Sequence, residues 1–506
     1  MCPLVRCLEG PDNPAMTATP SRRAILGGLA SLAGTAAFGA APDTSPRPVP
    51  RGIPLPARPK ISIGERLVRD ARLSGDVGFA LADTRSGEVL EARLGETPLP
   101  PASTLKTITA LYAMKKLGTA HRFGTEVLVT GPIRHGKMTG DLILSGDGDP
   151  TLDTDRLAEL AVQIREAGIT EVEGRFLLWA DALPRNDRID EDQPEHVGYN
   201  PSYGGLNLNF NRVHFEWERI QDENYSVTME ARARRFSPST SVASMSIIDR
   251  KTPVFDHWTN GHADNWSVAR FALGHRGARW LPVRYPALYA GDVFRTLARS
   301  NGIILKPPAV TPIAPVGAAV IARVESEPLV PLLTDMLRYS TNLTAEIAGL
   351  TASRLTGPLT GLSHSARRMS AFATLQGTQH AMFRDHSGLG YGSALTPLDM
   401  VRVLGAHPEL APMLKNVDLS LDKSRPTPDG VRVRAKTGTL NFVSSLAGFI
   451  DAGERRLAFA FFSADTERRD AIPPEQRERP PGVKGWGNRS RRLQKELLRN
   501  WAQVFV

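Results

Sequence analysis

The segment that decides the fold is 100–106, which reads PPASTLK. After it, apolar residues recur at helical spacing over 108–113, and Gly118 follows. This pattern predicts a helix that begins near Ser103 and ends at Gly118. Because residues i and i+3 share one face of a helix, the Lys106 amine lies within reach of the Ser103 hydroxyl.

A serine paired with a lysine in this way is suited to nucleophilic catalysis. The hydroxyl is a weak nucleophile until a base removes its proton. A lysine serves as that base when burial or neighbouring cations lower its pKa. The free N–H groups of a helix start suit a developing oxyanion. A Ser-x-x-Lys pair alone is common, and a capping serine beside an exposed lysine is its ordinary interpretation.

Two further motifs follow along the chain. Ser340-Thr341-Asn342 comes after a helical stretch over 329–337 and places a hydroxyl two residues from a carboxamide. Lys436-Thr437-Gly438-Thr439 ends an alternating strand pattern that begins at Val431. Its glycine permits close approach of a ligand, and its lysine and hydroxyls suit a carboxylate. Taken singly, these motifs are an ordinary loop pair and a strand end with a solvated lysine.

Together and in this order, the three motifs are the signature set of penicillin-binding proteins and serine β-lactamases. Four longer segments narrow the resemblance: SGDGDPTL at 145–152, STNLTAE at 340–346, DHSGL at 385–389 and KTGTL at 436–440. In these segments the chain resembles the D-alanyl-D-alanine carboxypeptidase/endopeptidase family, the low-molecular-mass class C penicillin-binding proteins. The resemblance extends over residues 60–506.

The resemblance implies an acyl-enzyme mechanism without a cofactor. It makes Ser103 the nucleophile and Lys106 its general base. It makes Ser340 the proton relay to the leaving amine, while Asn342 orients the substrate amide and Lys106. Lys436-Thr437-Gly438-Thr439 is the implied substrate-binding strand, where Lys436 and Thr437 hold the terminal carboxylate. The backbone N–H groups of Ser103 and Thr439 form the implied oxyanion hole.

Two positions depart from the family pattern. Thr341 stands where an acidic residue is frequent, and His386 stands where glycine is frequent. Neither change removes a catalytic atom, so a difference is expected in specificity. The roles of Asp385 and Ser387 stay unassigned, with a structural turn and a substrate contact as the alternatives.

A serine β-lactamase and an inactive peptidoglycan-binding protein are the alternatives to a DD-peptidase. Class A β-lactamases deacylate with a glutamate some tens of residues after the second motif. Here no glutamate occurs between Glu346 and Glu409. The motif set is intact, whereas an inactive scaffold usually loses one of its members. We therefore expect a DD-peptidase that β-lactams inhibit covalently and that acts on peptidoglycan stem peptides.

Strand and helix patterns predict an α+β fold of the penicillin-binding transpeptidase type, an antiparallel sheet flanked by helices. Alternating residues near 77–90 predict one hairpin, and residues 442–463 predict another. We expect a catalytic domain over 61–145 and 320–506. Between its halves, 146–319 reads as an inserted region that is mostly β.

The first 60 residues read as an export signal followed by a linker. The segment 21–26, SRRAIL, precedes an apolar run rich in glycine and alanine, typical of a twin-arginine signal peptide over 1–41. An ordinary secretory signal is the alternative, and 1–15 is a candidate gene-model extension. Residues 42–60 contain seven prolines and predict a linker. The expected location is the periplasm or cell envelope.

Composition sets the outer limits. The chain has 506 residues, 41% hydrophobic, with a net charge of +9, which suits a packed core and excludes a polytopic membrane protein. Its cysteines, Cys2 and Cys7, precede the segment 21–26 of the predicted signal peptide, and its histidines lack metal-ligand spacing, so we expect no metal. No nucleic-acid module is recognisable. The basic run 489–499 reads as a solvated helix face, with peripheral contact to anionic envelope polymer or membrane as the alternative.

Overall fold

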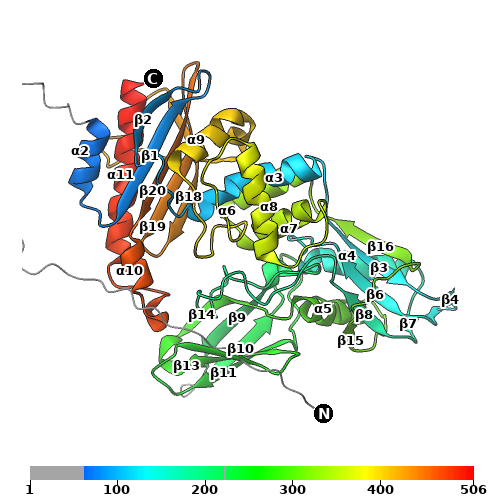
Figure 1. The fold of residues 1–506 in the computed structure, drawn as a ribbon. Coiled ribbons are helices and arrows are strands. Elements are labelled where there is room, and N and C mark those ends of the chain that lie inside the picture. Colours follow the sequence, from blue (N-terminus) through cyan, green and yellow to red (C-terminus); the bar gives the residue numbers. More distant parts are fainter. Residues whose placement is uncertain (1–61, 221–223, 506) are drawn as a thin grey trace, which may run out of the picture. The chain divides into compact units, whose positions relative to one another are not determined.

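The structure is a computed structural model that describes residues 62–220 and 224–505 (Figure 1). The predicted signal peptide and linker lie outside the described residues. Within the described ranges, none of the helices combines the length and apolar content that crossing a bilayer requires. These ranges also hold no group of three or more His, Cys, Asp or Glu side chains placed to share a metal ion.

A six-stranded antiparallel sheet lies in the half that the sequence predicts to be catalytic, here called the catalytic half, in the order β17-β18-β19-β20-β1-β2. The two predicted hairpins are confirmed as β1–β2 and β19–β20. Strand β1 pairs with β20 from Asp76 opposite Ala464 to Asp83 opposite Leu457, which joins the two ends of the chain. The strands are β1 (Asp76–Asp83), β2 (Val89–Arg93), β17 (Lys415–Asn416), β18 (Val431–Leu440), β19 (Val443–Ala452) and β20 (Arg455–Ala464).

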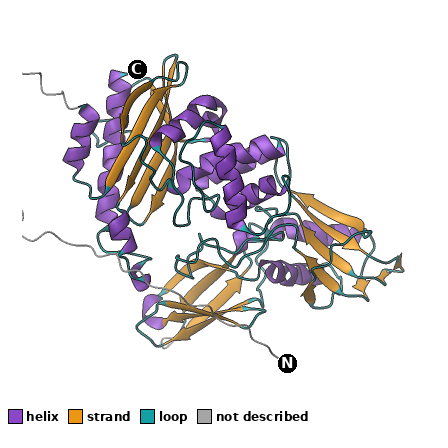
Figure 2. Ribbon diagram, in the orientation of Figure 1, coloured by secondary structure: helices purple, strands orange, loops and turns teal. Residues whose placement is uncertain are grey.

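The two faces of this sheet carry side chains of different size. On β1, Phe79 and Leu81 face the terminal helices α2 (Ile63–Ala71) and α11 (Val483–Val504), where Trp501 packs edge-on to Phe79 at 5.5 Å between ring centroids. Ala80 and Ala82 face the other way, into the helical core. Small side chains let helices approach the sheet closely, so the catalytic helices settle on this alanine-rich face (Figure 2).

The helices of the catalytic half pack on the alanine-rich face. They include α3, which ends at its predicted stop, Gly118, and α6, which covers the predicted stretch 329–337. Short α10 leads toward the C-terminal helix. Their bounds are α3 (Lys106–Leu117), α6 (Leu329–Tyr339), α7 (Asn342–Arg354), α8 (Leu362–Leu375), α9 (Pro397–Ala406) and α10 (Thr466–Asp470).

The inserted region contains a five-stranded sheet, β15-β8-β6-β3-β16, and three small sheets, β10-β9-β14, β11-β13-β12 and β4-β5-β7. Helices α4 (Thr154–Glu166) and α5 (Pro286–Ser300) pack against the five-stranded sheet. The strands are β3 (Gly124–Val129), β4 (Ile133–Arg134), β5 (Lys137–Met138), β6 (Leu142–Gly146), β7 (Glu171–Val172), β8 (Phe176–Trp179), β9 (Arg212–Arg219), β10 (Tyr225–Glu230), β11 (Ala243–Ile248), β12 (Phe255–Thr259), β13 (Asp264–Ala269), β14 (Arg276–Pro282), β15 (Pro308–Val310) and β16 (Ala319–Glu325).

The bounds of this region differ from the expected 146–319. Strand β3 pairs with β6 on one side and with β16 on the other, so the five-stranded sheet begins at Gly124 and ends at Glu325. The pairing of β3 with β16 joins segments far apart in the sequence, and local patterns do not reveal which sheet a strand joins. We therefore propose 124–325 as the inserted region.

Candidate active site

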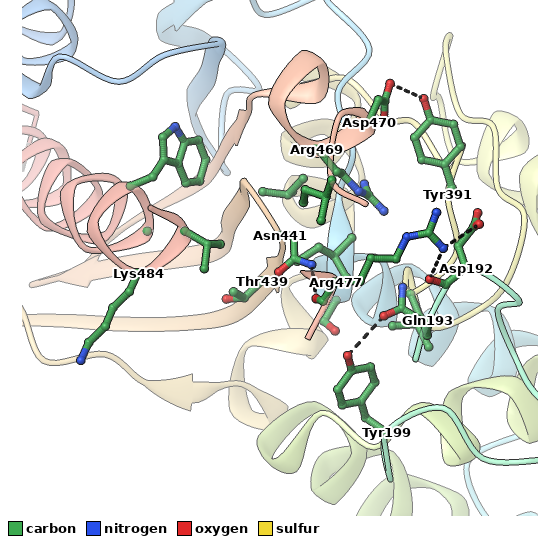
Figure 3. Close-up of a pocket in the computed structure, with 18 of the residues that line it drawn as sticks. Asp192, Gln193, Tyr199, Tyr391, Thr439, Asn441, Arg469, Asp470, Arg477 and Lys484 are labelled. Carbon is green, nitrogen blue, oxygen red and sulfur yellow. Dashed lines mark hydrogen bonds and ion pairs between the residues drawn. The ribbon is translucent and has the colours of Figure 1, made fainter. Parts of the chain in front are cut away.

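A cleft of about 720 Å³ brings the predicted motifs together (Figure 3). Ser103 reaches it from a 3-10 turn, Ala102–Leu105, that runs into α3. Ser340 and Asn342 reach it from the junction of α6 and α7, and Thr439 from β18. Three segments that are distant in sequence thus line one opening.

Lys106 lies beneath this cleft and is wholly buried. Its Nζ is 3.0 Å from Ser103 Oγ, 2.7 Å from Asn342 Oδ1 and 2.7 Å from the backbone oxygen of Ser387. The two carbonyl-type oxygens can only accept hydrogen bonds. A neutral amine gives its two N–H groups to them, and its lone pair then faces the Ser103 hydroxyl.

The electrostatics of Lys106 favour that neutral form near neutral pH. Burial is the main cause that lowers its pKa to about 7, and the positive charge of Lys436 lowers it further. The carboxyl groups of Glu346 and Asp385 act in the opposite direction. A lysine balanced in this way can take a proton from Ser103 and release it again.

A buried carboxylate holds the loop that supplies the Ser387 carbonyl. Glu346, on α7, accepts hydrogen bonds from the backbone N–H groups of His386 (2.9 Å) and Ser387 (3.0 Å). Within the loop, Asp385 accepts from the backbone N–H of Gly388 at 2.7 Å. These bonds fix the backbone that faces Lys106. Sequence reasoning left Asp385 unassigned and gave Glu346 no role.

His386, one of the two residues that depart from the family pattern, has a complement on α7. Its ring lies against Gly349, where an added Cβ would stand 2.1 Å from His386 Cγ. Its Nε2 is 2.7 Å from Ser365 Oγ, and burial lowers its pKa to about 3. A neutral imidazole thus fills space that a glycine at 386 would leave, and the missing side chain at 349 makes room for it.

Lys436 lies behind Ser340 and does not line the cleft wall. Only 2% of it is exposed, and its Nζ donates to Ser340 Oγ at 3.0 Å and to the Thr437 carbonyl at 2.8 Å. Burial lowers its pKa to about 8. Of the predicted substrate-binding strand, Thr439 lines the cleft, and the side chains of Thr437 and Thr439 are exposed.

Gly438 is required by the packing of β18 against the serine turn. A Cβ added there would lie 2.1 Å from Ser445 Oγ and 2.9 Å from the Ser103 nitrogen. The strand therefore passes directly beside the Ser103 backbone. This close approach is what an oxyanion hole built from the N–H groups of Ser103 and Thr439 needs.

Most of the chain matches one known protein family. The chain matches the model of the D-Ala-D-Ala carboxypeptidase 3 (S13) family over residues 61–479. The chain belongs to this family. It is a serine-type D-Ala-D-Ala carboxypeptidase, which confirms the resemblance seen in the motifs.

Individual relatives of the carboxypeptidase align over most of their length. The D-alanyl-D-alanine carboxypeptidase of Actinomadura sp. (strain R39) is 29% identical over 78% of this chain and 79% of its own. The D-alanyl-D-alanine carboxypeptidase DacB of Haemophilus influenzae is 24% identical over 81% and 89%. The crystal structure of penicillin binding protein 4 from Haemophilus influenzae matches with a TM-score of 0.69 at 21% identity, covering 87% of this chain and all of that one. This likeness confirms the α+β fold.

The inserted region of the carboxypeptidase reaches Asn342, the asparagine of the second motif. The Asn342 Nδ2 donates to the backbone oxygen of Tyr199 at 2.8 Å, so Oδ1 is turned toward Lys106. Tyr199 belongs to the loop 180–205 between β8 and β9. No local sequence pattern indicates this contact, because 143 positions separate the two partners.

The outer part of the cleft is polar and carries both signs of charge (Figure 3). Asp192, from the loop 180–205, pairs with Arg477 at 3.2 Å. Tyr391 donates to Asp470 at 3.1 Å, and Arg469 lies over the Tyr391 ring. Such a wall suits a peptide with charged groups better than an apolar ligand.

Proposed function

We propose that this carboxypeptidase cleaves the D-alanyl-D-alanine terminus of peptidoglycan stem peptides through an acyl-enzyme at Ser103. The observation that carries the proposal is the geometry at Lys106. Two fixed acceptors, Asn342 Oδ1 and the Ser387 carbonyl, direct its lone pair at the Ser103 hydroxyl. The lowered pKa of Lys106 makes it a base at the pH where it works.

In acylation, Lys106 takes the Ser103 proton while Oγ bonds to the carbonyl carbon of the penultimate residue. The oxygen of that carbonyl becomes an oxyanion beside the N–H groups of Ser103 and Thr439. The C–N bond then breaks, and the leaving D-alanine amine needs a proton. Ser340 relays it: its hydroxyl gives its proton to the amine and receives in exchange the proton that Lys106 took from Ser103. The Lys436 amine donates to Ser340 Oγ at 3.0 Å, which leaves the Ser340 O–H to point into the cleft that it lines. Water later cleaves the ester and restores the Ser103 hydroxyl.

The terminal carboxylate of the substrate is assigned to the exposed side of β18. The hydroxyls of Thr437 and Thr439 are available there for hydrogen bonds. The Lys436 ammonium adds its positive charge from behind Ser340. This differs from a direct lysine–carboxylate ion pair, the role that the family resemblance implied, because Lys436 is almost fully covered.

Cleavage of D-alanyl cross-links is a second activity of the same site in this proposal. The cleft continues past the catalytic serine to Asp192, Arg477 and Tyr391. A cross-linked stem peptide carries further charged and amide groups beyond the scissile bond, and this polar wall accommodates them. Such a substrate lies outside the cytoplasm, in agreement with the expected export to the periplasm or cell envelope.

The experiment is intact-protein mass spectrometry after brief exposure to benzylpenicillin. A crystal structure of the Haemophilus influenzae penicillin binding protein 4 is described as complexed with a β-lactam. Here we expect a mass increase equal to one penicillin that persists for hours, because no deacylating glutamate follows the second motif. Ser103→Ala should show no adduct, while Ser86→Ala, an exposed serine in a turn, should behave as wild type. Loss of the adduct within seconds, with consumption of the drug, would identify a β-lactamase.

A further inference from the structure

A second cavity, of about 440 Å³, lies in the inserted region. It is lined by the loop 180–205, by β12 and by the residues just before α5. The same loop lines the catalytic cleft through Asp192, Gln193 and Tyr199. The volume falls in the range of ligand-binding sites, roughly 300–1,000 Å³.

Ion pairs hold several groups of this cavity in fixed positions. Arg188 lies 3.3 Å from both Asp187 and Glu195. His257 Nε2 lies 2.8 Å from Asp264, which keeps the pKa of His257 above its usual value. These bonds give a fixed array of donors and acceptors, to which the other arginines of the lining add further donors. Such an array suits a ligand with many hydroxyl or amide groups.

Arg284 forms the floor of the cavity and ties it to the loop. Only 2% of the residue is exposed, and its guanidinium donates to the backbone oxygens of Asp187 at 2.7 Å and Glu195 at 2.5 Å. A third bond runs to the backbone oxygen of Asn200 at 3.1 Å. Among the described residues, no acceptor faces its buried Nε–H. A buried donor of this kind gains most from a ligand oxygen.

Aromatic rings complete the cavity. Trp258, on β12, is 60% exposed, which is unusual for so large an apolar surface. Tyr285 is held in place by Thr259, whose hydroxyl donates to it at 2.6 Å, and by Arg185 5.9 Å from its ring centroid. An open indole beside a rigid polar array fits a sugar ring, which has an apolar C–H face and a rim of polar groups.

We propose that this cavity binds the glycan strand of peptidoglycan, a β-1,4-linked chain of N-acetylated sugars. The inference rests on the proposed function, because stem peptides hang from that strand. The loop 180–205 supports it, since one loop lines the site of the peptide and the site assigned to the sugar. Binding there holds the polymer while the cleft selects a stem.

The test compares two substrates and two variants. Trp258→Ala removes the stacking surface, and Phe271→Ala, a 67% exposed aromatic that does not line the cavity, is its control. Each is assayed on insoluble peptidoglycan and on a soluble peptide that ends in D-alanyl-D-alanine. We expect Trp258→Ala to lower turnover of the polymer about tenfold, as loss of an aromatic contact does at a binding site. Turnover of the soluble peptide should stay within about twofold of wild type in both variants.

Triacetylchitotriose, which carries no peptide, is the direct probe. Its binding to the full chain is measured by saturation-transfer NMR. Saturable binding that Trp258→Ala abolishes and Phe271→Ala retains would support the glycan site. Equal polymer turnover in the two variants, or binding of a sugar-free stem peptide in place of the trisaccharide, would overturn it. Penicillin labelling of the wild type distinguishes the two possible failures. Labelling persists if only the glycan site is wrong, and it is absent if the catalytic proposal is wrong.

Discussion

The two walls of the catalytic cleft each carry a buried lysine, and the two differ in their partners. On the helical wall, Lys106 lies near the carboxyl groups of Glu346 and Asp385 and binds two carbonyl-type oxygens. On the strand wall, Lys436 binds a hydroxyl and one backbone oxygen, and its main charged neighbour is Lys415. These partners suit the same side chain to the role of a base on one wall and to that of a source of positive charge on the other, as we propose.

This difference shows that two buried lysines can differ in their chemistry because the groups around them differ. Burial is the main cause that lowers the pKa of both lysines, to about 7 and about 8. Only Lys106 lies three residues after the serine that we propose as the nucleophile, and its N–H groups are directed at two other oxygens. Lys436 donates to the hydroxyl of Ser340, which we propose as the proton relay.

Replacement of each lysine in turn by arginine should show the difference between the two walls most clearly. Arginine stays protonated at every accessible pH, so Lys106→Arg should lower acylation by penicillin about a thousandfold, as loss of a general base does. Lys436→Arg keeps the charge and should lose far less. Stopped-flow labelling with a fluorescent penicillin measures both rates. Similar losses in the two variants would contradict the assignment of a base to one wall only.

Removal of the charge on the strand wall should have the next largest effect. Lys436 does not touch the carboxylate, but its charge attracts it from behind Ser340, and such an attraction in a partly buried site contributes roughly 1.5–3 kcal/mol. Lys436→Ala should therefore reduce acylation efficiency about ten- to a hundredfold. The loss should be much smaller for a substrate analogue that lacks the terminal carboxylate. Equal losses on both substrates would show that Lys436 acts only through Ser340. The comparison is made as kcat/KM on matched peptides.

A smaller change in the acylation rate is expected when Glu346, beneath the helical wall, is replaced. For the wild type, acylation should rise with pH through about 7, as Lys106 loses its proton. Burial raises the pKa of Glu346 itself to about 8, and the negative charge of its ionised form raises the pKa of Lys106. Glu346→Gln removes that charge and should move the rising limb of the pH–rate profile to lower pH. The plateau rate should fall about tenfold, because an amide can accept from only one of the two N–H groups of the loop.

The pH–rate profile of acylation distinguishes a positioning role for Glu346 from a merely structural one. Loss of folding alone would lower the plateau and leave the limb where it was. Glu327→Gln, on the exposed segment before α6, is the control and should leave both features unchanged. A limb that moves to higher pH would contradict the sign of the interaction.

The smallest effect on activity is expected from Gly349→Ala, which tests the packing behind the helical wall. The added methyl group meets the His386 ring and should destabilise the fold by about 1–3 kcal/mol. Gly405→Ala, on α9, has open space around it and should be neutral or stabilising by up to about 1 kcal/mol. Urea unfolding measures both. The paired change Gly349→Ala with His386→Gly should recover much of the lost stability.

The sequence predicted the parts of the site that lie close together in the chain. The spacing of Ser103 and Lys106 required only helix geometry, and the hairpin β19–β20 required only alternation. The partners of these residues come from far away, as with the Tyr199 carbonyl on Asn342. Glu346 was overlooked because an acidic residue within a helix normally reads as a solvated side chain. Its burial depends on the loop 385–390 folding over it, which no local pattern shows.

The pairing of β1 with β20 means that the sheet of the catalytic half can be completed only late in synthesis. Residues 76–83 emerge early from the ribosome, while their neighbours at 455–464 emerge almost last. The sheets of 124–325 pair only among themselves, so this region can fold while translation continues. Until β20 has been synthesised, β1 in the catalytic half has an unpaired edge, and unpaired strand edges promote aggregation. A chain cut short before residue 455 would thus keep its inserted region, lose its nucleophile's support and expose β1 to other chains.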